Sequence, residues 1–202
     1  MNKEIKGDNE LSKSFWYVFG GFSLIIIIIV AMGFFIFSKK DKKVVEEKKH
    51  GGNVTLNYSS NVKGLSIINA LPTTDALGAV SDLDGQYFDF SIKVDLDKAK
   101  NVEYEISAKK IIKDSTISDE DIRIYLEKEE SGTYTKILAP SNFKATNKES
   151  AIGTPKGNMV LTKVKKNKSS VENYRLRMWL SENSLMQNGN YSVEIDVVGK
   201  AK

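Results

Sequence analysis

The chain has 202 residues and no cysteine, which excludes a disulfide framework and a thiolate metal site. Its net charge of +4 is unevenly spread: residues 1–14 are neutral, residues 38–50 carry +3, and the remaining stretch of about 150 residues carries +1. That stretch has ordinary globular composition and the length of one domain. Because nucleic-acid binding needs Lys and Arg clustered on a folded domain, we expect no nucleic-acid partner.

Residues 15–37 form an uncharged stretch of 23 residues, most of them Ile, Phe, Val or Leu. As a helix this stretch is about 35 Å long, enough to cross a hydrocarbon core of about 30 Å. We therefore expect a single transmembrane helix that acts as a signal anchor, with the lipid bilayer as partner. A buried core helix is the alternative interpretation.

Two processed forms of this stretch are alternatives to an uncleaved anchor. A cleavable signal peptide has a shorter apolar region and a small-residue cleavage site, whereas here Ser38 and two lysines follow the span. Residues 21–25, GFSLI, resemble the processing site of type IV prepilins. The residues before Gly21 are largely apolar and Ile26 stands where prepilins have glutamate, so the prepilin interpretation is the weaker one.

The sequence gives conflicting signals about the side of the membrane on which the C-terminal part lies. Three lysines precede the span and six follow it, and the excess of positive charge alone would place the C-terminal part in the cytoplasm. A head of 14 residues that cannot fold alone, a strand-rich domain without cysteine and a lone leading helix favour the opposite orientation. We therefore predict an extracytoplasmic domain at the cell membrane.

Residues 38–52 are rich in Lys and Glu, which are good helix formers, and end in two glycines. This composition predicts a basic stalk that continues the helix out of the bilayer and ends at Gly51 and Gly52. Its lysines can bind anionic lipid head groups, and a solvated stalk is the alternative. The membrane-surface candidates are Lys39, Lys40, Lys42 and Lys43.

From Asn53 onward apolar residues recur at every second position, which is the period of half-buried strands. The runs with this character are residues 54–58, 65–69, 88–94, 102–106, 122–126, 133–138, 158–165, 174–180 and 191–197. Short strands with polar turns and no long helical pattern predict an all-β domain over residues 53–202, an antiparallel β-sandwich of the jelly-roll or immunoglobulin-like type.

Two segments of this domain allow different local structures. Residues 118–121 resemble a helix cap, but the following residues alternate, so we expect a turn followed by a strand. Residues 181–190 contain Asn188 and Gly189, and we expect them to join the last two strands as a hairpin.

No catalytic constellation is evident in the sequence. The only histidine is His50, in the basic stretch, so no Ser-His or Cys-His pair can be built within the domain. Carboxylates are plentiful without a distinguished pair. We expect no enzymatic activity and no cofactor, with a carbohydrate-directed enzyme as a remote alternative.

Calcium is the one metal for which the sequence offers a candidate, because Asp82 and Asp84 precede Gly85 and Asp89 follows. An EF-hand loop needs a further oxygen ligand before the glycine and a glutamate at its twelfth position, where this chain has Lys93. A hairpin turn has the same short spacing, so Asp82, Asp84 and Asp89 are a weak calcium candidate.

The run from Tyr174 to Leu180 alternates so that Arg175, Arg177 and Trp179 share the face opposite the core. Arginine and tryptophan are enriched at binding hot spots, which makes these three residues candidates for an interaction surface. The alternative is that they form cross-strand ion pairs and cation–π contacts within the sheet.

Residues 84–94, 122–126, 174–180 and 191–197 together resemble the strand pattern of membrane-anchored surface proteins of low-GC Gram-positive bacteria. More distantly they resemble the TasA and camelysin group of biofilm-fibre proteins. The resemblance implies a jelly-roll or immunoglobulin-like sandwich outside the cell with a structural role. The uncleaved span departs from TasA, and no catalytic residue is carried over.

The sequence therefore predicts a single-pass bacterial cell-envelope protein whose extracytoplasmic sandwich is a structural module or binds other envelope proteins or a cell-wall polymer. The alternative is an envelope sensor or a regulatory subunit of a membrane complex. A type IV pilin-like subunit or a carbohydrate-directed enzyme comes third.

Overall fold

The computed structural model describes residues 44–50, 54–60, 64–81, 87–185 and 188–202. The expected head, the expected transmembrane helix at residues 15–37 and the four membrane-surface lysines all lie outside the described residues. Within the described ranges, no helix has the length and apolar character needed to cross a membrane.

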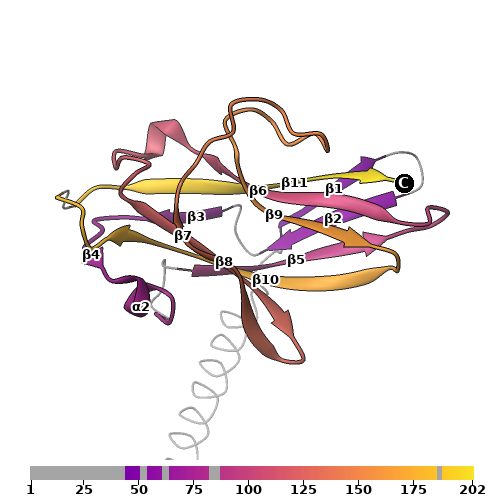
Figure 1. The fold of residues 1–202 in the computed structure, drawn as a ribbon, viewed down its shortest axis with the longest axis horizontal. Helices are drawn as coiled ribbons and strands as arrows, with labels where there is room; N and C mark the ends of the chain where they lie inside the picture. Colours follow the sequence, from indigo (N-terminus) through magenta and orange to yellow (C-terminus); the bar gives the residue numbers. More distant parts are fainter. Residues whose placement is uncertain (1–43, 51–53, 61–63, 82–86, 186–187) are drawn as a thin grey trace, which may run out of the picture. The chain divides into compact units, whose positions relative to one another are not determined.

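The described residues fold into two β-sheets with little helix (Figure 1). The larger sheet has the strand order β1-β2-β5-β10-β7-β8, with the short β4 parallel to the end of β10, and the smaller sheet has the order β3-β11-β6-β9. The strand bounds are β1 Val44–His50, β2 Val54–Ser60, β3 Gly64–Ile67, β4 Pro72–Thr73, β5 Tyr87–Asp95, β6 Val102–Lys110, β7 Ile122–Glu130, β8 Thr133–Asn142, β9 Met159–Lys166, β10 Ser170–Ser181 and β11 Tyr191–Ala201; the helices are α2 Asp75–Gly78 and the 3-10 turn η1 Ile112–Asp114. The predicted all-β fold of mainly antiparallel sheets is confirmed.

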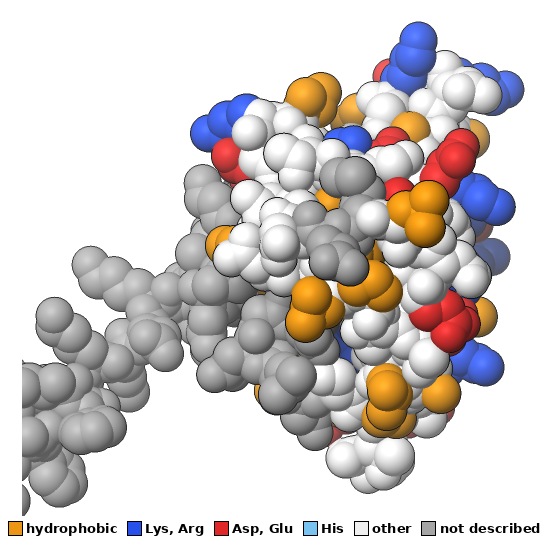
Figure 2. All heavy atoms as spheres, turned by 90° about the vertical axis from the view of Figure 1, so that its left-hand side faces the viewer, with side chains coloured by type: hydrophobic (Ala, Val, Ile, Leu, Met, Phe, Trp, Pro, Cys, Tyr) orange, Lys and Arg blue, Asp and Glu red, His pale blue; other side chains and the backbone are white. Residues whose placement is uncertain are grey.

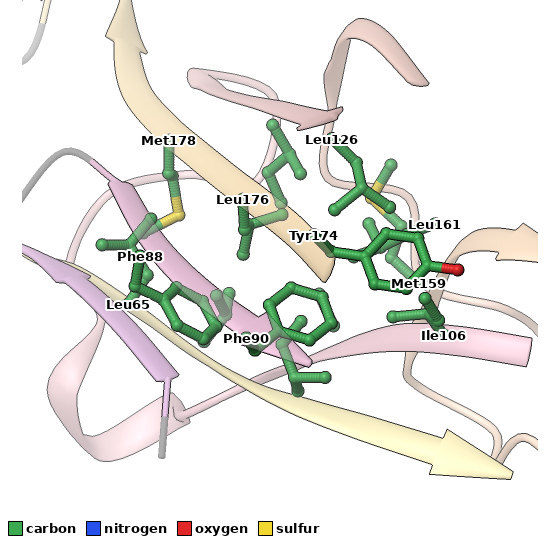
Figure 3. Close-up of a cluster of buried hydrophobic side chains, with 14 of the residues drawn as sticks. Leu65, Phe88, Phe90, Ile106, Leu126, Met159, Leu161, Tyr174, Leu176 and Met178 are labelled. Carbon is green, nitrogen blue, oxygen red and sulfur yellow. The ribbon is translucent and has the colours of Figure 1, made fainter. Parts of the chain in front are cut away.

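One hydrophobic core lies between the two sheets, because the alternation of each long strand turns one face inward (Figure 3). On β10 the inward side chains Tyr174, Leu176 and Met178 are fully buried. Leu176 lies opposite Phe88 of β5 on one side and Leu126 of β7 on the other. The centre of β10 is therefore surrounded by apolar side chains from neighbouring strands.

A pair of tyrosines links the sheets through this core. The hydroxyl oxygens of Tyr104 on β6 and Tyr174 on β10 lie 2.9 Å apart, and neither residue is exposed. Burial raises the pKa of both phenols, that of Tyr174 to about 12, so both hydroxyls remain protonated and one donates to the other. Each buried hydroxyl thus has its hydrogen-bond partner in the opposite sheet.

Each of the nine runs with alternating apolar residues overlaps a strand, so the predicted strands are confirmed, although β3 ends at Ile67, two residues before the expected end of its run. The turn at residues 118–121 is confirmed as well, since the amide of Asp121 donates to the carbonyl of Ser118 at 3.1 Å and β7 begins at Ile122.

The helical stalk is a wrong prediction for residues 44–50. These residues form β1, which pairs with β2 along its whole length, from Val44 opposite Ser60 to His50 opposite Val54. Intrinsic helix propensity amounts to a few tenths of a kcal/mol per residue for Lys and Glu, and a full ladder of strand pairing overrides it. The folded unit therefore begins about nine residues earlier than the expected boundary at Asn53.

The hairpin between the last two strands is also wrong. β10 belongs to the larger sheet and β11 to the smaller one, so residues 182–190 cross from one sheet to the other. Two strands joined by a hairpin and two strands that lie in different sheets show the same alternation of apolar residues. The sequence pattern therefore does not show whether the connecting residues stay in one sheet or pass to the other.

Candidate functional site

Arg175, predicted to lie on the outer face of the larger sheet, binds residues of its own domain. Its Nε and Nη2 donate to both carboxylate oxygens of Asp89 on β5 at 2.7 and 2.9 Å. Its guanidinium also lies over the rings of Tyr87 and Tyr134, 4.4 and 4.3 Å from their centroids. The ion pair raises the pKa of Arg175, so the side chain is a fixed cation between two aromatic rings.

Arg177 and Trp179 are buried, with 5% and 2% of their surface exposed. The Nε of Arg177 donates to Glu127 on β7 at 2.9 Å, and its Nη1 donates to the carbonyl of Ser81. The cross-strand ion pairs and cation–π contacts that were the alternative for this face are therefore present. Among the three interaction candidates, only Arg175 is accessible at the surface.

Trp179 is covered by α2, a short helix that the sequence analysis did not anticipate. A Cβ added to Gly78 would lie 2.3 Å from the indole, so the helix backbone rests directly on the ring. Arg123 on β7 holds the other end of α2 by two bonds to the carboxylate of Asp75, at 2.9 and 2.5 Å. The signal in the sequence is Thr74, whose hydroxyl caps the helix, followed by Asp75 in its first turn.

The described part of the structure does not show the three calcium candidates as one site. Asp82 and Asp84 lie outside them, and Asp89 uses both carboxylate oxygens to bind Arg175. The described part of the chain also contains no group of three His, Cys, Asp or Glu side chains placed to hold a metal ion.

A groove of about 370 Å³ opens on the outer face of the smaller sheet, where the connection from β8 to β9 folds over β6 and β11. Asn158 lies at its base and donates to Ser107 at 3.2 Å and to Asp196 at 3.4 Å. Glu194 and Asp196 line the groove together with Lys109 and Lys156. Two carboxylates beside two lysines make a polar, nearly neutral surface that lacks the aromatic lining typical of a ligand pocket.

A buried ion cluster closes the core at the end of the sandwich where β10 begins. Glu172 on β10 binds Lys128 on β7 at 2.7 Å and also Lys166 on β9, so the cluster bridges the two sheets. Burial acts to raise the pKa of Glu172, but the hydrogen bonds from Lys128 and Lys166 outweigh it and hold the pKa below its ordinary value of 4.5.

Replacing Glu172 with glutamine is expected to lower the free energy of unfolding at pH 7 by about 1 to 2 kcal/mol, because two lysines lose a charged partner. A lowered pKa in the folded state means that this contribution is present above pH 4.5 and is lost as the pH falls through the folded-state pKa. Urea unfolding of both proteins between pH 7 and pH 3 should show the difference shrinking below pH 4.5. A difference that stays constant with pH would contradict the assignment to this carboxylate.

Most of the large apolar side chains that are exposed in the described ranges lie at the opposite end of the sandwich, where β10 ends and β11 begins (Figure 2). The β3–β4 connection joins this end because the amide of Ala70 donates to Gly189, and residues 115–117 join it because the amide of Thr116 donates to Asn190. We call this surface the apolar end; its members, all more than 60% exposed, are Ile68, Leu71, Leu77, Val80, Ile112 and Leu185.

The apolar end was not predicted from the sequence, because its six residues come from four separate connecting segments. Monomeric proteins expose single apolar residues routinely, but a group of large ones at one end of a domain is typical of a contact surface. The exposed charged residues on the same connections are Lys113, Asp114, Glu120 and Glu182. Neither a family model nor a curated protein matches this chain, so the candidate surfaces rest on its own geometry.

Proposed function

We propose that this chain is a single-pass, membrane-anchored protein of the bacterial cell envelope whose extracytoplasmic β domain is an interaction module without catalytic activity. The anchor rests on the uncharged stretch at residues 15–37. The role of the domain rests on one observation, the apolar end, where six large apolar side chains are presented by connections on a rigid two-sheet scaffold.

The outer face of the larger sheet supports this choice of surface. Arg123, Arg175 and Arg177 each bind a carboxylate within the domain, at Asp75, Asp89 and Glu127. These pairs occupy the charged groups that a ligand would otherwise contact. The six apolar side chains of the apolar end, in contrast, remain more than 60% exposed and are not covered by the domain itself.

The chemistry of the apolar end also indicates the kind of partner that would fit. Ile112 and Leu185 are 82% and 99% exposed, and their connections carry three exposed carboxylates, Asp114, Glu120 and Glu182, against one exposed lysine, Lys113. Exposed apolar side chains among more carboxylates than lysines are complementary to an apolar protein surface flanked by Lys or Arg. We therefore assign the apolar end to contact with another envelope protein of that character.

We further infer that the sandwich is of the jelly-roll type. The strands β5 to β11 repeatedly change sheets, and the orders β3-β11-β6-β9 and β5-β10-β7-β8 are those of an eight-stranded jelly roll, with β1 and β2 added at one edge. This order supports the proposed relationship to membrane-anchored surface proteins of low-GC Gram-positive bacteria and, more distantly, to the TasA and camelysin group.

A photo-cross-linking amino acid placed at Leu77 or Leu185 in the full chain tests the proposed contact in cells. We expect both positions to give a covalent adduct of the same size, and Leu77→Glu to abolish the adduct formed at position 185. Val171, an exposed apolar residue on β10 away from the apolar end, is the matched control. An adduct of equal yield at position 171, or none at positions 77 and 185, would contradict the proposal.

A further inference from the structure

The end of the sandwich opposite the apolar end gathers lysines from three separate stretches of the chain (Figure 1). The amides of Asn101 and Lys202 each donate to the other residue's carbonyl, at 3.3 and 2.9 Å, and the amide of Leu96 donates to Ser169 at 3.0 Å. These bonds bring the β5–β6 connection, the β9–β10 turn and the end of β11 together. We call this surface the lysine end; its members are Lys98, Lys100, Lys165, Lys168, Lys200 and Lys202, all exposed.

Few carboxylates offset this charge. Glu103 binds Lys202 at 2.7 Å, and Asp95 and Asp97 are the other acids on the same connections. Lys98, Lys100, Lys168 and Lys200 make no ion pair with any residue in the described ranges. The charge of the domain is therefore unevenly distributed. One end is rich in lysine, and the connections at the apolar end carry more exposed carboxylates than lysines.

β1 runs toward this end of the sandwich, because His50 lies opposite Val54 and the next residue, Thr55, lies opposite Asp95. Val44 pairs with Ser60, Ser60 with Phe90, and Phe90 with Tyr174, so the first residue of β1 lies four residues along the strands from the lysine end. Six residues, 38–43, separate Val44 from the last residue of the expected span, and an extended chain of that length reaches at most about 25 Å. In an anchored chain, a tether of this length allows the lysine end to reach the membrane surface.

We propose that the lysine end binds the anionic head groups of the membrane in which the chain is anchored. Lysine is a compact, strongly hydrated cation on a flexible stem, which suits a mobile, negatively charged lipid surface. None of the residues at 95–101, 165–170 or 200–202 is aromatic, so the surface lacks the stacking groups that single-stranded nucleic acids require. The inference rests on the proposed membrane anchor and adds a second contact with the lipid, made by the folded domain.

The test uses the full chain in nanodiscs of neutral or 30% anionic lipid that carry a nitroxide quencher on the head group. A fluorophore is attached to a single cysteine at the lysine end, Asn167→Cys, or near the apolar end, Asn183→Cys; both positions are exposed and the chain has no other cysteine. At low salt we expect at least threefold more quenching at position 167 in anionic than in neutral nanodiscs, and none of this difference at position 183. The difference should disappear in 0.5 M salt, which screens exposed charges.

Four lysine-to-glutamine changes at Lys98, Lys100, Lys168 and Lys200 should abolish the lipid-charge dependence at position 167. The matched control changes four exposed lysines elsewhere, Lys109, Lys113, Lys136 and Lys148, and should retain it at the same net charge. Equal quenching in both lipids, or equal loss in both variants, would overturn the inference while leaving the anchor intact. Failure of the chain to enter nanodiscs at all would overturn the proposed anchor and the inference with it.

Discussion

Replacing Leu176 with alanine is expected to lower the free energy of unfolding of the β domain by about 3 kcal/mol. Leu176 is completely buried at the centre of β10, between Phe88 and Leu126 on the neighbouring strands. Strands on both sides hold the backbone in place, so the cavity left by the missing methyl groups cannot collapse fully. Urea or thermal unfolding of a fragment that begins before Val44 measures the effect, as a fall of about 6 to 12 °C in Tm.

Val171→Ala on the same strand is the control, because Val171 is 61% exposed. A surface truncation of this kind is expected to change stability by less than about 0.5 kcal/mol. Similar losses at positions 171 and 176 would contradict the placement of the core on one face of β10.

Replacing Trp179 with alanine is expected to cost about 3 kcal/mol or more, although this side chain lies on the outer face of its sheet. The ring is 2% exposed because α2 covers it, and the backbone of Gly78 leaves no room between them. Its removal takes away the surface on which α2 rests, so the bonds between Asp75 and Arg123 lose their support. Limited proteolysis should then cut near α2 faster than in the unchanged protein.

Trp179→Phe keeps part of the packing and should lose less stability than the alanine variant. Gly78→Val supplies an independent test, since its side chain would overlap the indole and should also expose α2 to protease while Leu176 and the core stay in place. An unchanged cleavage rate near α2 in all three variants would show that the contact between helix and ring does not hold the helix.

The strands could be predicted from the sequence because each has one buried face, and burial imposes a period of two on the apolar residues. β1 could not, because Val44–His50 has four charged residues in succession and no alternation, and only its partner β2 makes it a strand. The crossing from β10 to β11 was missed for a related reason. Local patterns report which face of a strand is buried and carry no information on which sheet the strand joins.

The candidate surfaces were less accessible to prediction than the fold. Alternation placed Arg175, Arg177 and Trp179 on the outer face, but their burial depends on Asp89, Glu127 and Gly78, which are distant in sequence. The apolar end and the lysine end are assembled from loops whose neighbours are set by the strand order. A lysine in one turn gives no sign that it lies beside the lysines of two others.

The proposed arrangement, in which a membrane anchor holds an interaction domain outside the cell, is tested most directly by the accessibility of a single thiol in intact cells. Lys148→Cys is suitable because the residue is exposed, lies on the connection from β8 to β9 and would be the only cysteine of the chain. A membrane-impermeant maleimide should label it as fully in intact cells as in permeabilised ones, with the protein remaining in the membrane fraction after carbonate extraction. Labelling only after permeabilisation would place the domain in the cytoplasm, and release from the membrane fraction would remove the anchor.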